Sequence, residues 1–314
     1  QCLPGLLDDA CAVDGQVKPE WNYLLNSLSN LGPQVLRERQ QIARRILRDD
    51  GASYNIFGRE GAQGNNWELD LVPHVIGSED WAKIESGLLE RAELFNLMLR
   101  DFYGPRTLLR YGVLPPQALF SHGGFLRACQ GIHLPGEHEL ILHSVDMVRQ
   151  RDGRMCVLSD RTQVPSGAGY VLENRTVMSR VFPSLFRDSH VHRIARFFQR
   201  LRAKLTSLSP SNDTPRIIVL TPGGLSETYF EHAYLANYLG LPLVQSGDLV
   251  VRNGFVWMKS LEGLARVDVI FRRVDDIFCD PVELRSDSQL GIPGLLEVVR
   301  AGNVVITNPL GSGI

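Results

Sequence analysis

The sequence predicts a mixed α/β protein, in which a helical part with a β-hairpin precedes a Rossmann-like domain with a mostly parallel sheet. Two observations support this fold class. Before residue 208, amphipathic helical stretches surround a single strand pair. After residue 214, short apolar runs alternate with helical stretches, which is typical of a parallel sheet. We expect domains at 1–208 and 214–314, separated by the polar segment SPSNDTP.

The first domain contains the longer helices. Its helical stretches share apolar residues at three- and four-residue spacing, and they cover 16–50, 78–104, 170–181 and 187–208. Ser78 is a suitable N-cap, and Gly104 followed by Pro105 ends that helix. The stretch 54–77 is expected to be irregular or weakly extended. Strand-like runs at 138–149 and 154–159 flank an Asp-Gly turn and predict a hairpin.

In the second domain, predicted strands alternate with predicted helices. Apolar, β-branched runs predict strands at 216–220, 241–245, 266–274 and 303–308. Helices are expected at 228–239, which Gly240 ends, and at 291–302. Asn253-Gly254 predicts a further hairpin turn within 248–260. We expect this domain to be incomplete, because the chain stops on a glycine-rich loop directly after a strand.

Composition narrows the possible functions. The chain has 33 Lys and Arg against 35 Asp and Glu, a formal charge of −2, which argues against a nucleic-acid surface. No apolar run approaches the roughly 18 residues that span a bilayer, and no secretory signal is visible. The five cysteines show no metal-binding spacing, so reduced thiols in a cytoplasmic protein are expected.

Two acids belong to the predicted hairpin. Asp146 lies inside the first strand, and Asp160 ends the second. A carboxylate in an apolar strand is costly unless it is paired or binds a cation, and carboxylates are suitable Mg²⁺ ligands. A two-residue turn pairs 146 with 159 and leaves Asp160 on the other face, whereas a one-residue bulge brings the two acids together. The alternative is that Asp146 is a solvent-facing residue of an edge hairpin.

The stretch LSDRTQVPSGAGYVLENR, 158–175, follows directly. Hydroxyls and unhindered backbone N–H groups before a helix favour phosphate or an oxyanion, and they come here from Thr162, Ser166, Gly167 and Gly169. The stretch has neither the Walker A pattern nor GxSxG, so a plain turn is the other interpretation.

The end of this stretch adds charge. Glu173, Asn174 and Arg175 bring cation ligands and an anion donor close in sequence to Asp160 and Arg161. Each has an ordinary structural use, since an acid near a helix start complements the helix dipole and an exposed ion pair contributes little. Their clustering favours a functional role.

Polar residues also follow the strands of the second domain. Thr221 stands at the carboxyl end of the first strand, where α/β sheets bind ligands, and Glu227, Glu231 and His232 follow it. A lone histidine here is more often structural than a metal ligand.

Arg272 and Arg273 end another strand of this domain. They could clamp phosphate or pair with the neighbouring Asp275 and Asp276. The glycine pattern does not fit GxGxxG, which argues against a nicotinamide-dependent oxidoreductase.

Taken together, the chain resembles the bacterial circularly permuted ATP-grasp family, type 2. The segments that carry the resemblance are 54–73, 119–132, 158–175, 220–244, 267–296 and 301–314. A more distant similarity, to glutathionylspermidine synthetase-like amide ligases, rests on the acid-bearing hairpin and the Thr/Pro/Ser turn after it. Members of the family continue beyond the LGSG loop, so the resemblance implies a partial ATP-grasp module.

The resemblance implies ATP- and Mg²⁺-dependent ligation of a carboxylate to an amine through an acyl-phosphate. It implies Mg²⁺ ligands at Asp146, Asp160, Glu173 and Asn174, and catalytic residues at Arg161, Ser166 and Arg175. It also implies ATP contacts by Thr162, Gly167, Gly169, Arg272 and Arg273, and an acceptor side at Thr221, Glu227, Glu231 and His232, with Arg272 as a further candidate there.

The same resemblance implies partners. The substrate would be a small molecule or peptide with a carboxylate and an amine, and a helical partner protein and a peptidase are expected to act beside the ligase. The alternative is a non-catalytic module of the same family that binds a nucleotide or peptide and serves in assembly.

Overall fold

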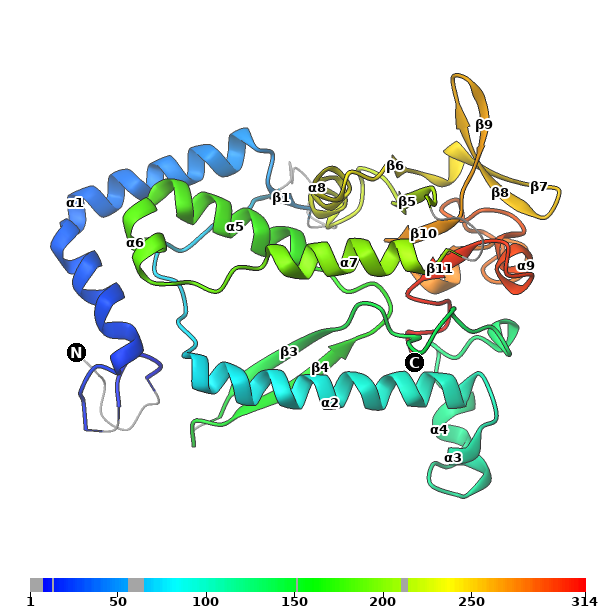
Figure 1. Cartoon of the computed structure of the whole chain (residues 1–314), viewed down its shortest axis with the longest axis horizontal. Helices are drawn as coiled ribbons and strands as arrows, with labels where there is room; N and C mark the ends of the chain where they lie inside the picture. Colours follow the sequence, from blue (N-terminus) through cyan, green and yellow to red (C-terminus); the bar gives the residue numbers. More distant parts are fainter. Residues whose placement is uncertain (1–7, 13, 56–64, 151, 210–213) are drawn as a thin grey trace. The chain divides into compact units, whose positions relative to one another are not determined.

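The computed structural model describes residues 8–12, 14–55, 65–150, 152–209 and 214–314 (Figure 1). The fold is mixed α/β with a parallel sheet, as the sequence predicts. Three predictions fall partly outside the described residues: the extended stretch at 54–77, the hairpin turn at Arg151 and the linker at 209–215. The predicted domain boundary between 208 and 214 therefore stays a prediction.

The chain forms two compact units, and each is assembled from several segments. Unit 1 comprises Gln1–Leu89, Asp146–Ser159 and Gly167–Ile194, and unit 2 comprises Glu90–Val145, Asp160–Ser166 and Ala195–Ile314. The hairpin and the stretch after it contribute residues to both units. Each unit is described by itself below.

Unit 1 is mainly helical. Its described elements are α1 (Pro19–Asp49), the first half of α2 (Ser78–Phe102), β1 (Ser53–Tyr54), β2 (Asn65–Asn66), α5 (Ala168–Val181) and α6 (Pro183–Asp188). Helix α1 packs against α5, and α5 against α6. The sequence predicts one uninterrupted helix over 16–50, but α1 is kinked at Gly32, whose φ is 73°. Pro33 follows and lacks the N–H that would continue the helix, which explains the kink.

The predicted hairpin is present but its first strand is shorter than expected. Strands β3 (Ser144–Arg149) and β4 (Met155–Arg161) form a two-stranded sheet. The prediction placed the start of the first strand at residue 138. The N–H groups of Ile141 and Leu142 instead donate to the side chain of Asn308, so they are not available to a strand ladder.

Unit 2 contains the predicted parallel sheet, with strand order β11-β10-β5-β6. Its strands are β5 (Ile217–Leu220), β6 (Leu243–Val244), β10 (Val269–Arg272) and β11 (Val305–Thr307). All neighbours run parallel. Helix α7 (Ala195–Ser207) contacts β10, and helix α8 (Tyr229–Leu239) contacts β5 and β6. The apolar side chains of the two central strands, β10 and β5, are buried, which explains their continuous apolar sequences.

A three-stranded antiparallel meander accompanies this sheet. It consists of β7 (Leu249–Arg252), β8 (Phe255–Ser260) and β9 (Gly263–Arg266), and helix α9 (Leu295–Arg300) contacts β8. The Asn253-Gly254 turn is confirmed, since both residues have positive φ, 53° and 75°. The sequence predicts one strand over 266–274, but Arg266 ends β9 and β10 begins at Val269. The carboxylate of Asp268, between the two strands, accepts the backbone N–H of Arg216.

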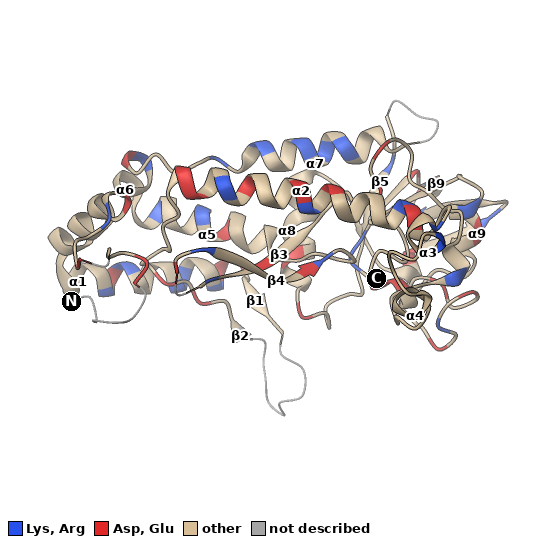
Figure 2. Cartoon of the chain, turned by 90° about the horizontal axis from the view of Figure 1, so that it is seen from below, with Lys and Arg blue, Asp and Glu red and all other residues tan. Residues whose placement is uncertain are grey.

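The remaining helices are short or differ in length from the prediction. Helices α3 (Thr107–Arg110) and α4 (Pro116–Phe120) belong to unit 2. The helix predicted at 187–208 is shorter than expected: α6 ends at Asp188, and α7 begins only at Ala195. Figure 2 shows that α7 carries basic residues and no acid, although the chain as a whole is nearly neutral. None of the described helices has the length and apolar character needed to cross a membrane.

The cysteines correct one prediction. Cys11 is disulfide-bonded, so the expectation of reduced thiols throughout the chain is wrong for this residue. Cys129, Cys156 and Cys279 are free. Burial raises the pKa of the Cys129 and Cys279 thiols to about 12, so both stay protonated and unreactive at neutral pH. Spacing can exclude a metal motif, but it cannot show a pairing that depends on the folded chain.

Candidate functional site

The carboxyl ends of three parallel strands bring polar residues together in unit 2. In the sheet, Arg272 of β10 pairs with Leu220 of β5, and Phe271 of β10 pairs with Thr307 of β11. The segments that follow these strands therefore leave the sheet at the same edge. This edge is where open α/β sheets bind ligands.

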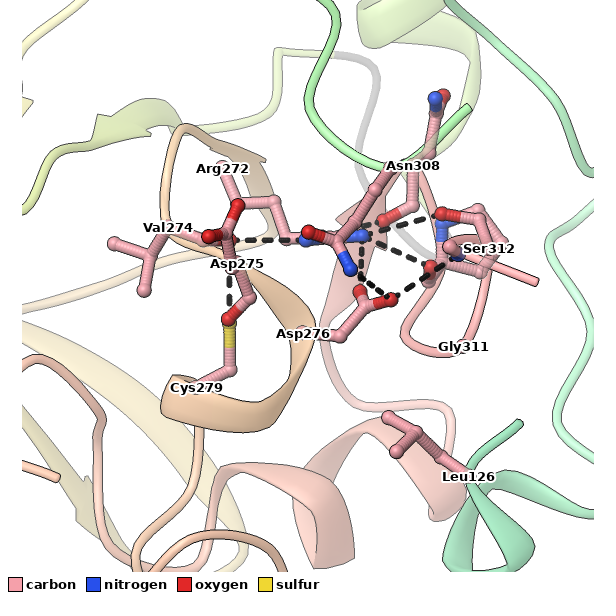
Figure 3. Close-up of polar contacts among 12 residues, drawn as sticks. Leu126, Arg272, Val274, Asp275, Asp276, Cys279, Asn308, Gly311 and Ser312 are labelled. Carbon is pink, nitrogen blue, oxygen red and sulfur yellow. Dashed lines mark hydrogen bonds and ion pairs between the residues drawn. The ribbon is translucent and has the colours of Figure 1, made fainter. Parts of the chain in front are cut away.

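Arg272 is the centre of a buried polar cluster at this edge (Figure 3). Its Nε donates to the carbonyl of Asn308 at 2.8 Å and its Nη1 to that of Val274 at 2.9 Å. Its Nη2 donates to the carbonyl of Pro309 and to Ser312 Oγ, and it forms an ion pair with Asp276. The sequence left open a phosphate clamp or an ion pair with the following aspartates. The ion pair is present, and it is buried.

Asp276 connects this cluster to the stretch after the hairpin. Its Oδ2 accepts the side-chain amide of Gln163 at 3.0 Å and the backbone N–H of Gly313 at 3.2 Å. Burial raises the pKa of Asp276, and the contacts with Arg272, Gln163 and Gly313 oppose that rise. Thr162 Oγ1 also donates to the carbonyl of Ser312 at 2.5 Å. The stretch thus binds the segment after β10 through Gln163 and the loop after β11 through Thr162.

Asn308 completes this connection. Its Oδ1 accepts the N–H groups of Ile141 and Leu142, both at 3.0 Å. Its Nδ2 donates to the carbonyls of Leu142 and Thr162 at 2.7 and 2.6 Å. One buried amide therefore holds two segments, before and after the hairpin, at the carboxyl edge of the sheet.

Asp160, a predicted Mg²⁺ ligand, has its own partners within unit 2. Arg91 of α2 donates to both carboxylate oxygens, Nε to Oδ1 at 2.8 Å and Nη2 to Oδ2 at 2.5 Å. His143 Nε2 lies 2.9 Å from Oδ1. The hydrogen bonds from Arg91 hold the pKa of Asp160 below its usual value, so this carboxylate is ionised at neutral pH.

The other predicted metal ligands lie in unit 1. Asp146 Oδ2 accepts the hydroxyl of Ser159 at 2.6 Å, and Asn174 Oδ1 accepts Trp67 Nε1–H at 2.8 Å. Glu173 is buried on α5. In the part of the chain that the structure describes, no three His, Cys, Asp or Glu side chains form a group that could hold a metal ion. The magnesium assignment stays a prediction.

The predicted phosphate-binding turn leads into α5. Gly167 caps the helix with a φ of 116°, a conformation that residues with a side chain rarely adopt. Gly169 is buried in the first turn, whereas Ser166 is half-buried and Arg161 is exposed at the end of β4. Arg175 donates to the carbonyl of His192. Burial lowers the pKa of Arg175, which nevertheless stays charged.

The predicted acceptor residues lie directly after β5, just before α8 and in the first turn of α8. His232 is buried, with Thr221 Oγ1 2.9 Å from Nδ1 and Thr228 Oγ1 3.0 Å from Nε2. Burial, with a smaller effect of the Arg273 charge, lowers the pKa of His232 to about 3. This histidine is therefore neutral at physiological pH and has a partner on each ring nitrogen, as expected for a structural residue.

Glu231 and Arg273 are also buried in this region. Glu231 Oε2 lies 3.9 Å from Arg273 Nη2, while Glu227 is exposed. The structure thus brings Thr221, Glu231, His232 and Arg273 together, and it places Arg272 in the separate cluster with Asp276.

The buried histidine leads to a pH-dependent stability. The pKa of His232 is about 3 in the folded chain and about 6.5 in the unfolded chain. Between these two pH values the unfolded chain binds a proton at His232 and the folded chain does not, so stability falls as the pH falls below about 6.5. We expect the wild type to lose about 2 kcal/mol more stability than His232→Gln between about pH 7 and about pH 5. Urea denaturation of both proteins at the two pH values measures this difference. Parallel losses in the two proteins would show that His232 is not the group responsible.

Sequence reasoning missed several residues of the site. Asn308 and Gln163 hold the sheet edge, and Arg91 and His143 bind Asp160. Asn308 had a usable signal, since a polar residue stood at the end of a predicted parallel strand. Arg91 and His143 had none, because their partner is far away in sequence.

A parallel α/β sheet with polar residues gathered at its carboxyl edge is the arrangement of ligand-binding α/β proteins. The chain belongs to a family of this class, described as circularly permuted ATP-grasp type 2, which matches residues 73–314. ATP-grasp proteins are in general ATP-dependent ligases that bind ATP and Mg²⁺.

Three similar proteins carry names that describe them as uncharacterized. The uncharacterized protein Rv2567 of Mycobacterium tuberculosis is 42% identical over 310 residues, covering 96% of this chain and 35% of its own length. The uncharacterized protein sll0335 of Synechocystis is 36% identical over 308 residues, covering 98% of this chain and 64% of its own. ML0605 of Mycobacterium leprae is 36% identical, with 54% of its length covered. The chain spans less than two thirds of each of these relatives.

Proposed function

We propose that the protein to which this chain belongs joins a carboxylate to an amine in an ATP- and Mg²⁺-dependent reaction through an acyl-phosphate. In the first step a substrate carboxylate oxygen attacks the γ-phosphorus of ATP and ADP leaves. In the second step the amine attacks the acyl carbon, phosphate leaves, and an amide forms with loss of a proton. Membership of the ATP-grasp family supports the ATP-dependent ligase class.

One observation supports this proposal most strongly. The stretch predicted to handle phosphate, beginning at Asp160, is attached to the carboxyl edge of the parallel sheet. Thr162 binds the loop after β11, Gln163 binds Asp276 in the segment after β10, and Asn308 binds the carbonyl of Thr162. A segment that only joined a strand to a helix would not need three buried or half-buried polar contacts with the ligand-binding edge of a sheet.

The proposed Mg²⁺ ligands are chemically suitable. Carboxylate and amide oxygens are the donors that Mg²⁺ prefers, and Asp146, Asp160, Glu173 and Asn174 supply them. When bound, Mg²⁺ would neutralise the charge of the phosphate oxygens. Arg91 donates one hydrogen bond to each oxygen of Asp160. Because each carboxylate oxygen has two lone pairs, a metal ion can bind Oδ2 while the contact with Arg91 persists.

The cationic and hydroxyl side chains have electrostatic roles in this proposal. Arg161, exposed at the end of β4, would bind the transferring phosphate, and Arg175 and Ser166 would stabilise the oxyanion of the tetrahedral intermediate. Thr162, Gly167 and Gly169 remain proposed nucleotide contacts. Arg272 is assigned differently: its hydrogen bonds to three oxygen atoms of the loop after β11 and to the carbonyl of Val274 make it a positioning residue that holds the edge in shape.

Calorimetric titration of the full-length protein with ATP, with and without Mg²⁺, tests the proposal. We expect Asp160→Asn to weaken Mg²⁺-dependent ATP binding by about tenfold or more, because a carboxylate that binds the metal is lost. Arg91→Gln is the matched control, since it breaks the same ion pair and keeps the carboxylate. It should retain metal-dependent binding.

The outcomes separate the possible functions. Equal, metal-independent binding by the wild type and Asp160→Asn would exclude the proposed role of Asp160 and favour the non-catalytic nucleotide-binding module. Equal losses in Asp160→Asn and Arg91→Gln would indicate that the ion pair, and not the metal, matters. A helical partner protein, a peptidase and a cytoplasmic location remain predictions.

A further inference from the structure

Arg273 is a buried cation without a matching acceptor. Only 1% of its side chain is exposed, and neither Nε nor Nη2 has a hydrogen-bond partner among the described residues. The nearest carboxylate, Glu231, lies 3.9 Å from Nη2, which is too far for a hydrogen bond. Burial of an incompletely paired guanidinium is costly, so a native structure needs a reason to keep one.

The neighbouring Arg272 shows how the same fold satisfies a buried guanidinium. Arg272 donates to three carbonyls and one hydroxyl and pairs with Asp276. Two arginines that are adjacent in sequence and equally buried therefore differ in one respect, the presence of acceptors. The difference indicates that the acceptor of Arg273 comes from outside the described chain.

The position of Arg273 suits a ligand. It directly follows β10 at the carboxyl edge of the sheet, and its backbone N–H donates to the carbonyl of Leu220 in β5 at 2.7 Å. His232, in the first turns of α8, is close enough for the charge of Arg273 to affect its ionisation. Because His232 is neutral and the N-terminus of α8 has a partial positive charge, the surroundings favour an anion.

We propose that Arg273 binds a carboxylate group of the acid substrate. The planar guanidinium presents its N–H donors in a fork that matches the two oxygens of a carboxylate. Glu231 is the internal competitor for the same cation, at a distance that leaves the donors of Arg273 available. That this carboxylate belongs to the acid substrate rests on the proposed function.

The Arg273–Glu231 pair provides a test, because replacing each partner should change carboxylate affinity in the opposite direction. Glu231→Gln removes the competing charge and keeps the shape, so carboxylate binding should become stronger. Arg273→Gln removes the cation, so binding should become weaker by about tenfold or more. A purely structural role for the Arg273–Glu231 pair predicts no change in ligand affinity from either variant.

The experiment measures carboxylate binding to the full-length protein without ATP. Acetate, glutarate and L-glutamate are the carboxylate probes, inorganic phosphate is the comparison, and thermal shift and calorimetry are the readouts. We expect at least one carboxylate to stabilise the wild type, Arg273→Gln to lose this effect and Glu231→Gln to strengthen it. Arg285→Gln, which removes an exposed arginine paired with Asp287, should leave it unchanged.

Several results would overturn the inference. These are no stabilisation by any carboxylate, a response to phosphate alone, or equal binding by the wild type and Arg273→Gln. If Arg273→Gln does not fold, the double variant Arg273→Gln/Glu231→Gln removes both charges and should fold without binding. The two proposals can fail separately. If carboxylate binding depends on Arg273 but Asp160→Asn leaves ATP binding unchanged, the proposed function is rejected and the carboxylate site is retained.

Discussion

Replacing Arg272 by methionine is expected to lower the free energy of unfolding by about 3–5 kcal/mol. The side chain is fully buried, and its loss would leave the buried Asp276 without its cation. The acceptors at Asn308, Pro309 and Ser312 would also lose their donor. Urea denaturation at neutral pH, with the intact chain, measures the change.

Two controls show whether the charge pair causes this loss. The double variant Arg272→Met/Asp276→Leu removes both charges and should recover much of the lost stability, because a buried ion pair replaced by apolar residues is often neutral. Arg285→Met removes an exposed pair with Asp287 and should cost about 1 kcal/mol or less. If Arg272→Met costs no more than Arg285→Met, the buried cluster does not stabilise the sheet edge.

Replacing Asn308 by leucine is expected to cost about 3 kcal/mol or more in stability. The change leaves two N–H groups and two carbonyls, at Ile141, Leu142 and Thr162, without their partner in a buried place. Hydrogen exchange reports on the same contacts directly. The amides of Ile141 and Leu142 should exchange about tenfold faster or more in the variant, because their acceptor is gone.

Asn303→Leu is the matched control for this prediction. Among the described residues, the side chain of Asn303 makes a single hydrogen bond, from Nδ2 to the carbonyl of Gly254 at 2.9 Å. Its loss should cost about 1 kcal/mol and leave the exchange of Ile141 and Leu142 unchanged. Unchanged exchange at these two amides in Asn308→Leu would mean that Asn308 does not hold the hairpin segments at the sheet.

Local sequence predicted most elements because local contacts form them. Helix α2 begins at the predicted Ser78, α8 ends before Gly240, and the Asn253-Gly254 turn has the expected positive φ values. The errors have tertiary causes. The stretch before Ser144 is not a strand, because Asn308 takes its N–H groups. Helix α1 is kinked because glycine and proline interrupt its backbone hydrogen bonds.

The candidate site was predicted less completely than the fold. The sequence pointed to the stretch after the hairpin and to the strand ends, where Thr162 and Thr221 lie at the expected sheet edge. It did not indicate that Arg91 and His143 would bind Asp160, or that Arg272 would be fully enclosed. Charge and residue type are visible in a sequence, but the partner of a charge is not.

The sequence by itself determined the α/β class, the alternation of strands and helices after residue 214, and the family to which the chain belongs. These follow from periodicity, turn residues and long distinctive segments, all of which are local. Only the tertiary structure decided that Arg272 has its acceptors within the chain, while Nε and Nη2 of Arg273 have none among the described residues. The two arginines are adjacent and chemically identical, so their difference arises from the loop after β11, which reaches one guanidinium and not the other.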